Sequence, residues 1–404
     1  MEQPKLGGSV TTLAVQHGVT DSDSLEEVRR KVSAWLTATV PLSGPDIKSA
    51  AVQDWWGVYH RSGLATPTWP VEFGGLGLSN EAARVVSTEV VSRQAPVPYN
   101  LVTVMMIGAV LMTWGTAEQR ARFLKPMATR SEVWCQMFSE PGAGSDLASL
   151  STKAERDGDH WVVNGQKVWC SYAAEAGRGL ALVRTDPSLP KHRGITALAI
   201  DMCSPGVTVR PLRQITGDST FCEVFLDDVI VPDSDRVGEV NGGWTVAGTM
   251  LSAERSTLGG GGVSALARVG GVDLDTILEW LPGSSSDVRD EVIRAVIVDR
   301  VVQLLGARVQ SEPQYEPVVK LMQGQHNQNL QELALKVYGP SSIAHLSDDV
   351  EARLIAWGFL RSRANTIAGG TSEVMRSLIG ERILGLPRDP NPFNGKPWSE
   401  IPRS

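Results

Sequence analysis

The stretch "STKAERDGDHWVVNGQKVWCS", residues 151–171, lies where the chain changes from helical to strand-forming patterns. Two turn signals, Asp157-Gly158 and Asn164-Gly165, separate short segments of alternating apolar and polar residues. Alternation with a period of two is typical of strands that bury one face, and Asp-Gly or Asn-Gly pairs favour hairpin turns. The stretch therefore predicts a β-hairpin region with a turn at each dipeptide.

The same pattern continues on the C-terminal side of this stretch and stops at Pro232. The following runs are rich in β-branched or aromatic residues and end at Gly, Pro or Asp: "GLALVRT", "GITALAID", "GVTVRPLR" and "FCEVFLDDVIVP". Outside this region the apolar spacing is helical, as at Val28, Val32, Trp35 and Leu36. The sequence thus predicts an α+β chain with an N-terminal helical domain (1–130), a central β-barrel or sandwich domain (131–236) and a C-terminal helical domain (237–404).

Composition excludes several classes of function. The chain has 404 residues and a net charge of −7, which argues against a nucleic-acid partner, since phosphate binding needs clustered Lys and Arg. It contains no apolar run of about 18 residues and no secretory signal, so we expect no membrane span and a cytoplasmic location. The scattered histidines form no metal motif, so no metal is expected. The four cysteines are predicted to be reduced core residues: Cys135, Cys170, Cys203 and Cys222.

The segment "TIAGGTSEVMRS", residues 366–377, is a glycine corner that leads into a helix. Thr371 or Ser372 is suited to be the N-cap, and Gly385 to end the helix. The apolar side of this helix is predicted to consist of Val374, Leu378, Ile379 and Ile383.

Two stretches at the start of the β-region have the residue types of a ligand site. In "SEPGAGSD" (139–146) the glycines allow close approach of the backbone to a ligand, and Ser139 and Ser145 offer hydroxyl groups. In "NGQKVWCS" (164–171) Trp169 and Ser171 are two residues apart, so they share one face of a strand. The alternatives are a plain connecting loop and a core tryptophan.

A third stretch, "GGWTVAGTMLSAERSTLGGGG" (242–262), contains a carboxylate on an apolar helix face. Steps of three and four residues define that face: Trp244, Ala247, Leu251, Glu254 and Leu258. Burial would raise the pKa of Glu254 toward the range in which it accepts a proton at neutral pH. Pairing with an arginine, or exposure at the end of the face, is the alternative.

Together these stretches resemble the acyl-CoA dehydrogenase family, in the right order over nearly the full chain. The resembling segments are "WPVEFGGLGLS", "WGTAEQRARFLKPM", "WCQMFSEPGAGSD", "VVNGQKVWCS", "FCEVFLDDVIVP", "SAERSTLG" and "AGGTSEVMRSLIGERILG". The resemblance implies a helical domain, a central β-domain and a C-terminal four-helix bundle. It also implies FAD bound between the β-domain and the C-terminal helices, an acyl-CoA substrate, and an electron-transfer flavoprotein as acceptor.

The resemblance further implies roles for individual residues. Gln136, Phe138 and Ser139 would contact the flavin ring, Trp169 would wall it, and Ser171 would bond its phosphate or ring edge. Thr371 and Glu373 would reach the ribitol, pyrophosphate or adenosine part of FAD. Ser145 would line the acyl-CoA channel.

Most members of this family have the catalytic glutamate at the position that matches Gly369. A minority have it on the helix that matches residues 244–258, just before an arginine, as in Glu254-Arg255 here. The resemblance therefore implies that Glu254 removes the α-proton while the β-hydrogen leaves as hydride to flavin N5, giving a trans-2-enoyl-CoA. Arg255 would steady the helix, and the backbone N–H near Gly369 would stabilise the enolate oxygen. The glycine leaves room for a branched or ring-bearing acyl chain.

Two FAD-binding features of the family are missing. No phenylalanine occurs between Phe225 and Phe359, so the Arg-x-x-Phe-Gly motif is absent, and "LKVYGPSS" replaces the expected glutamine and glycine pair. Arg268 or Arg289 could substitute in a homo-oligomer, or a related chain could supply the missing arginine in a heterotetramer. The alternatives are a non-catalytic subunit, and an acyl-CoA oxidase or flavin monooxygenase with the same fold.

Overall fold

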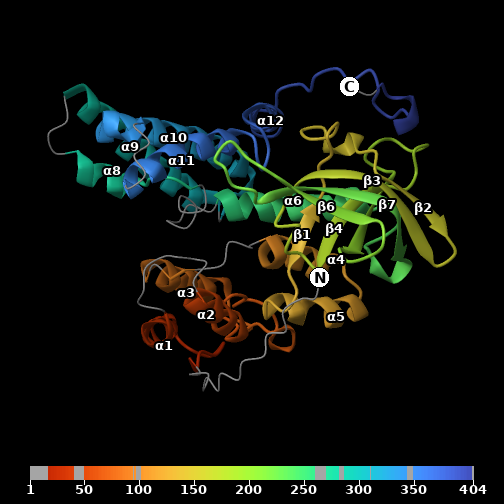
Figure 1. Cartoon of the computed structure of the whole chain (residues 1–404), viewed down its shortest axis with the longest axis horizontal. Coiled ribbons are helices and arrows are strands. Elements are labelled where there is room, and N and C mark those ends of the chain that lie inside the picture. The colour runs from red at the N-terminus through yellow and green to blue at the C-terminus, as the bar shows by residue number, and fades with distance from the viewer. Residues whose placement is uncertain are drawn as a thin grey trace. The chain divides into compact units, whose positions relative to one another are not determined.

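The structure, a computed structural model, describes residues 17–40, 50–93, 95–96, 102–259, 270–281, 286–309, 311–343 and 349–402, with the backbone alone for Ala50 and residues 254–259. By compactness the chain forms two units (Figure 1). The first comprises Met1–Pro98 and Ala121–Ser131, and the second Tyr99–Arg120 and Glu132–Ser404. Residues 99–120 therefore group with the β-region and the C-terminal helices, although sequence analysis placed them in the N-terminal domain.

Helices make up the first third of the chain, as predicted. They are α1 (Leu25–Thr39), α2 (Ala50–Arg61), η1 (Val71–Phe73), α3 (Asn80–Ser92), η2 (Val102–Ile107), α4 (Gly108–Trp114) and α5 (Ala117–Ala128). Ser24 begins α1 with a capping box, in which the Ser24 hydroxyl accepts the Glu27 N–H and the Glu27 carboxylate accepts the Ser24 N–H. The residues that predicted this helix are all buried in it: Val28, Val32, Trp35 and Leu36.

The β-region is a sheet of eight strands within the described chain, in the order β6-β7-β3-β2-β4-β5-β8, with β1 paired to β4. The strands are β1 (Trp134–Met137), β2 (Lys153–Asp157), β3 (His160–Ser171), β4 (Arg178–Arg184), β5 (Ile195–Asp201), β6 (Val207–Leu212), β7 (Phe221–Pro232) and β8 (Arg236–Val237). All the runs that predicted strands after residue 171 are strands. β1 runs parallel to β4, whereas β3 and β7 are antiparallel.

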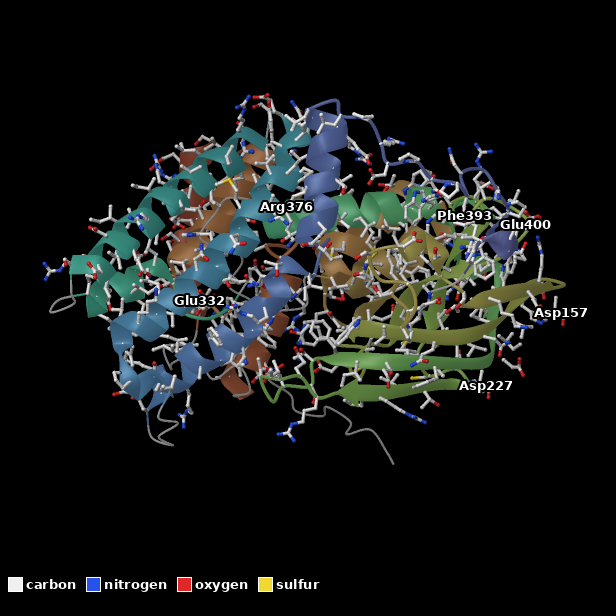
Figure 2. All side chains as sticks on the ribbon, turned by 90° about the horizontal axis from the view of Figure 1, so that it is seen from above. Asp157, Asp227, Glu332, Arg376, Phe393 and Glu400 are labelled. Atoms are coloured by element: carbon white, nitrogen blue, oxygen red, sulfur yellow. The ribbon has the colours of Figure 1, made fainter. Side chains whose placement is uncertain are left out.

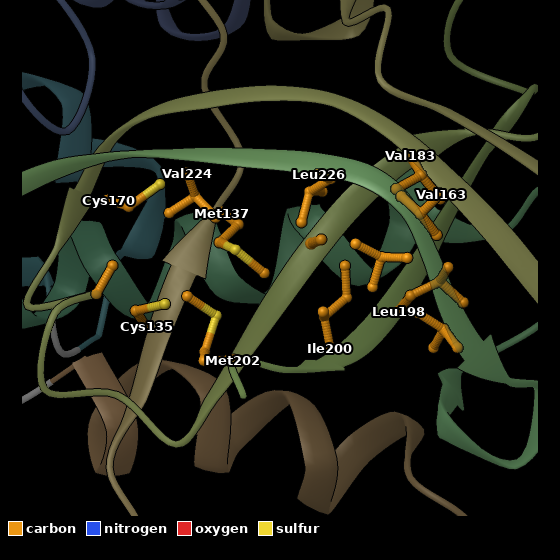
Figure 3. Close-up of a cluster of buried hydrophobic side chains, with 14 of the residues drawn as sticks. Cys135, Met137, Val163, Cys170, Val183, Leu198, Ile200, Met202, Val224 and Leu226 are labelled. Carbon is orange, nitrogen blue, oxygen red and sulfur yellow. The ribbon is translucent and has the colours of Figure 1, made fainter. Parts of the chain in front are cut away.

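The core of the β-region lies between strands that curve around it (Figure 3). Its buried side chains include Met137, Val163, Val183, Leu198 and Val224. Three of the four cysteines are buried and free there: Cys135, Cys170 and Cys222. Cys203 is exposed, so its prediction as a core residue was wrong. It follows the last residue of β5 in a turn, where the alternation of the strand no longer applies.

The two predicted turns had different outcomes. Asp157-Gly158 does connect β2 to β3, and Gly158 has a φ of +62°. Asn164-Gly165 is not a turn, because β3 continues through it with a shift of register against β7. The Asn164 side chain instead exchanges two hydrogen bonds with Asp228, which has a φ of +47°. A long-range partner across the bulge thus replaced the local turn.

The C-terminal helices surround α10. They are α6 (Gly243–Gly259), α8 (Leu274–Trp280), α9 (Ser286–Val309), α10 (Glu316–Tyr338), α11 (Val350–Ser362), α12 (Ser372–Leu378) and the π-helical turn η8 (Ile379–Ile383). Short 3-10 segments lie between or beside these elements: η3 (Leu147–Ser149), η4 (Asp233–Asp235), η5 (Pro313–Tyr315), η6 (Pro340–Ile343), η7 (Arg363–Thr366) and η9 (Trp398–Glu400). The α10 helix has several buried polar residues, including Gln331, which accepts the Val272 N–H at 2.9 Å and donates to the Val272 carbonyl at 2.8 Å. This pairing fixes the chain segment before α8 to the centre of the helical part.

The predicted last helix exists but differs in its detail. Thr371 is the N-cap, and its hydroxyl accepts the Val374 N–H. The regular helix ends at Leu378 and continues as the π-helical turn. Met375 is the buried residue of α12, whereas the four residues predicted for the apolar side are only half-buried. Within the described part of the chain, no helix is both long and apolar enough to cross a membrane.

Candidate active site

The "SEPGAGSD" loop is fixed to β3 by a buried ion pair. The Lys167 ammonium lies 2.8 Å from the Glu140 carboxylate, and the two side chains are 0% and 5% exposed. Lys167 also donates to the carbonyl oxygens of Phe138 and Leu182, so each of its three protons has an acceptor. The Glu140 carboxylate accepts the backbone N–H groups of Ser151 and Thr152. The loop therefore begins from a firmly held position.

The local environment keeps this pair charged. Burial alone would raise the pKa of Glu140, but the Lys167 ammonium and the N–H donors outweigh it and lower that pKa to about 2. Burial lowers the pKa of Lys167, and the carboxylate of Glu140 opposes that shift. Two buried charges with complete hydrogen bonding are tolerated, whereas one of them alone would be costly. The pair thus makes the loop and the strand depend on one another.

The residues predicted to contact the flavin ring lie along β1 and just after it. Gln136 is half-buried in β1, opposite Leu180 of β4. Phe138 is buried, and the half-buried Ser139 accepts the Val168 N–H with its carbonyl at 2.9 Å. This bond joins the segment to β3 immediately before Trp169.

Trp169 lies on a β-bulge and projects away from the core. The register between β3 and β7 shifts between Lys167 and Cys170, and Trp169 has a φ of +61°. Its side chain is 60% exposed and contacts the Phe221 ring edge-on, with 6.0 Å between the ring centroids. A bulge can turn a side chain to the other face of a strand. Here it leaves the indole exposed, although neighbouring residues of the strand are buried. Ser171, two residues on, is half-buried.

A loop between β6 and β7, residues 213–220, joins this end of the sheet to α11. The Thr220 carbonyl accepts the Tyr172 N–H at 2.9 Å. Asp218 in the same loop accepts a hydrogen bond of 2.6 Å from the indole N–H of Trp357 in α11. The end of β3 that contains Trp169 is thereby connected to α11, the helix that leads into the glycine corner.

The glycine corner itself is positioned by α10. Gly369 and Gly370 have φ values of +69° and +104°, a region that side chains with a Cβ rarely adopt. Before the corner, the Asn365 carbonyl accepts a bond of 2.7 Å from Lys320, and the Asn365 amide donates to Asn327. Thr371 is half-buried, whereas Glu373 is exposed and lies 3.6 Å from Arg376. In this chain, a side chain at position 369 would have to adopt the same left-handed backbone conformation.

The helix that includes the predicted base is well positioned at its start. A Cβ on Gly243 would lie 2.7 Å from the Thr196 carbonyl carbon of β5, so α6 begins in direct contact with the sheet. Further on, Thr249 accepts a bond of 2.9 Å from the Trp114 indole. Among the α6 residues whose side chains are described, Val246, Ala247 and Met250 are buried with Gly243, while Trp244 and Leu251 are half-buried. Of the predicted apolar face, Ala247 is thus buried, whereas the side chains of Glu254 and Leu258 lie outside the described part.

Several predicted residues lie outside what the structure describes. Glu254 and Arg255 belong to α6, but their side chains are outside the described part, and Arg268 is outside it altogether. Arg289 is exposed in the first turns of α9. Ser145 is exposed in its loop, and the altered "LKVYGPSS" segment forms the end of α10 with Gly339 as its cap.

A cavity of about 220 Å³ lies elsewhere, between α9 and α10. Its lining includes Glu291, Arg294, His326, Glu332 and Lys336. None of the residues predicted for catalysis or for FAD binding is among its lining residues.

Glu140 and Lys167 were not predicted as site residues, although both lie inside the quoted motifs. A signal was present, because Lys167 falls on the side of β3 that the alternation assigns to the core. A lysine at such a position needs a buried anion, and Glu140 is the acid of the adjoining glycine-rich loop. Asp218 and Trp357 had no comparable signal, because their contact joins segments that are 139 residues apart.

Comparisons with known proteins identify the family of the chain. Models of the acyl-CoA dehydrogenase N-terminal, middle and C-terminal domains match residues 22–131, 135–229 and 285–384. The acyl-CoA dehydrogenase IpdE1 of Mycobacterium tuberculosis is 36% identical over 390 residues, which cover 90% of this chain and 98% of the relative. The chain belongs to the acyl-CoA dehydrogenase family. It is thus an oxidoreductase of this class, whose members are flavoproteins.

Other relatives match this chain over different shares of their own length. The acyl-CoA dehydrogenase FadE34 of Mycobacterium tuberculosis is 40% identical over 81% of this chain, but the chain spans only 45% of that relative's length. The solved ChsE4-ChsE5 complex from Mycobacterium tuberculosis is 28% identical with a TM-score of 0.77, covering 92% of this chain and 100% of the matched one. The Tcur3481-Tcur3483 steroid ACAD is also 28% identical, with a TM-score of 0.76, covering 90% and 98%.

The residues present fit a flat ring cofactor on the β-side. An exposed indole on a strained backbone offers an aromatic wall, and the pinned Phe138–Ser139 segment lies beside it in the ladder. At the glycine corner, Gly369 and Gly370 have no side chains, so a ligand can approach their backbone closely. These three features match the chemistry that FAD needs for its ring and its polar groups.

Proposed function

We propose that this chain is the base-supplying subunit of an FAD-dependent acyl-CoA dehydrogenase. The observation that best supports this is the pinned loop of residues 139–146 beside the outward-facing Trp169. The substrate is an acyl-CoA thioester, and the product is the trans-2-enoyl-CoA. FAD, when bound, would accept the β-hydrogen as a hydride.

The other roles in binding and catalysis are assigned to individual residues of the chain. Glu254 removes the proton from Cα, and Arg255 holds the helix on which it lies. Gln136, Phe138, Ser139, Trp169 and Ser171 hold the flavin, with Thr371 and Glu373 at its ribitol or phosphate part. The backbone N–H near Gly369 donates to the thioester oxygen, where negative charge develops as the proton leaves. Ser145 lines the path of the acyl-CoA.

The reaction is tested with the purified protein. Flavin absorbance per chain is measured first, and the absorbance at the flavin maximum is then followed without oxygen while acyl-CoA thioesters of straight, branched and ring-bearing type are added. Bleaching, turnover with an artificial acceptor and negligible peroxide in air support the dehydrogenase, with an electron-transfer flavoprotein as the natural acceptor. Rapid peroxide formation would instead assign an oxidase, and a flavin-loaded protein that no thioester bleaches would assign a non-catalytic subunit.

We further propose that the working assembly is a heterotetramer with a related chain of the family. The Arg-x-x-Phe-Gly motif is missing here, and two solved relatives at 28% identity are named as pairs of unlike proteins. The outward side of α9 is apolar: Ile293, Val296, Ile297, Val301 and Leu304 are all between 38% and 57% exposed. The opposite side of the same helix packs into the core. A helix that is apolar on both sides is normally buried on both sides, and this face is where the related chain would bind.

Ile297→Glu is expected to weaken that assembly. A carboxylate buried in an apolar interface costs about 2 kcal/mol or more, which is roughly 30-fold in Kd. Native mass spectrometry of the co-expressed chains measures the fraction assembled. Val71→Glu is the matched control, because Val71 is 73% exposed in the other compact unit and the charge change is the same. Equal assembly of the two variants would contradict the proposed interface.

A further inference from the structure

The last part of the described chain is attached to the β-region through one buried side chain. We call residues 386–402 the C-terminal strap. Trp398 is its buried residue, at 8% exposure, while the others described are exposed or half-buried. Figure 2 labels Phe393 and Glu400 of the strap, next to the strands. Because chain ends with little buried surface are poorly ordered unless they are tied down, the strap depends on Trp398.

Trp398 contacts two loops of the β-region at once. Its backbone N–H donates to the Leu189 carbonyl at 2.9 Å, and the next N–H, of Ser399, donates to Pro187 at 3.0 Å. Its indole N–H donates to the Ser149 carbonyl at 3.4 Å. The first loop connects β4 to β5, and the second contact is with η3, which directly follows the glycine-rich loop of residues 139–146. One residue of the strap therefore bridges both.

Arg184 links the same two loops beneath the indole ring. Its guanidinium lies 4.8 Å from the centre of the Trp398 ring. It donates to the Ala148 carbonyl at 2.7 Å and to the Lys191 carbonyl at 2.8 Å. Arg184 is 3% exposed, and burial lowers its pKa to about 10, so it remains a cation at neutral pH. A buried cation with few charged partners is stabilised by the face of the indole above it.

The glycine-rich loop of residues 139–146 is held at its start by Glu140 and at its far end by residues that contact these anchors. A Cβ added at Gly142 or Gly144 would have no heavy atom within 4 Å, so the loop is open at these two glycines, while Ala143 between them is buried and paired with Glu140. At its far end, Asp146 accepts bonds of 2.7 and 2.8 Å from Lys191 and one of 2.5 Å from Ser149. The two donor residues are themselves held in place. The Lys191 carbonyl accepts a hydrogen bond from Arg184, and the Ser149 carbonyl accepts one from Trp398. The position of Asp146, and of Ser145 before it, thus follows the position of Trp398.

We propose that Trp398 is a positioning residue for acyl-CoA binding, acting through Arg184 and the Asp146–Lys191 pair on the loop that contains Ser145. This inference rests on the proposed function, in which that loop lines the path of the substrate. The strap comes directly from η8, so it joins the helix after the glycine corner to the loop on the substrate side. Preorganising a loop lowers the entropy cost of binding and changes KM more than the chemical step.

The test uses the flavin-loaded assembly with three strap variants. Trp398→Ala removes the ring and the indole donor, while Trp398→Phe keeps a ring over Arg184 and loses only the donor. Phe393→Ala is the matched control, since that ring contacts Lys396 within the strap itself, at 5.4 Å. Hydrogen exchange at the amides of Ser149, Leu150 and Arg193 is measured together with KM and kcat for an acyl-CoA.

For Trp398→Ala we expect exchange at these amides to rise by about 10-fold and KM to rise by about 10-fold with kcat within twofold. Trp398→Phe should fall between wild type and the alanine variant, and Phe393→Ala should match wild type. Unchanged exchange and KM in Trp398→Ala would overturn the inference, as would an equal loss in kcat and in kcat/KM. If the wild type turns over no acyl-CoA while exchange still responds to Trp398→Ala, the proposed function fails and the loop-holding role of the strap stands.

Discussion

Glu254→Gln is expected to slow the reduction of bound flavin by acyl-CoA roughly 10²- to 10⁴-fold. The amide has nearly the same shape as the carboxylate but cannot accept the α-proton. A thioester α-proton is weakly acidic. When no base accepts this proton, the transfer of hydride from Cβ is slow. FAD content and ligand binding should remain close to those of the wild type, because neither depends on the charge of this side chain.

Anaerobic stopped-flow absorbance at the flavin band measures this rate, and equilibrium spectra measure ligand binding. Glu239→Gln serves as the control, because Glu239 is exposed just before the same helix and undergoes the same chemical change. If Glu254→Gln bleaches at the rate of the wild type, Glu254 is not the base. The base would then be neither Glu254 nor the residue at the family's usual position, which is Gly369 here.

Lys167→Met is expected to destabilise the second compact unit by about 3–5 kcal/mol, because Glu140 would be left as a buried charge without its partner. The Phe138 and Leu182 carbonyls would also lose a donor. Since Phe138 begins the segment proposed to bind flavin, the variant should also contain less FAD per chain. Urea unfolding followed by circular dichroism measures the change in the free energy of unfolding.

Lys153→Met is the matched control in the neighbouring strand. Lys153 also pairs with a glutamate, Glu155 at 3.3 Å, but the two side chains are 53% and 69% exposed. Exposed pairs contribute about 0–1 kcal/mol, so this variant should unfold almost as the wild type does. Similar losses in the two variants would show that the burial of the Lys167 pair has no special weight.

The same pair predicts how stability depends on pH. The pKa of Glu140 is about 2 in the folded chain, against an ordinary value of 4.5. Because the folded pKa is the lower one, the contribution is present above about pH 4.5 and is lost as pH falls toward 2, and it amounts to at most about 3 kcal/mol. Glu140→Gln should therefore flatten the wild-type loss of stability across this window. An unchanged acid profile would contradict the assignment.

Local signals in the sequence were sufficient for the order of elements. The burial of Val28 and Val32 in α1, the N-cap at Thr371 and the strands after residue 171 all follow from short-range periodicity and capping. Each of these depends on residues within a few positions of one another. The same short range explains the error at Asn164-Gly165, where a partner 64 residues away, Asp228, decided the conformation.

For the candidate site, the sequence by itself identified the segments and the tertiary structure decided how they are held. "SEPGAGSD", Trp169 and the glycine corner were found from residue types and spacing. That Glu140 meets Lys167, that Trp169 points outward from a bulge, and that Trp398 lies on Arg184 could not be found in this way. These contacts depend on strand register and on the path of the chain end, which arise from the packing of the whole unit and leave no periodic trace in the sequence.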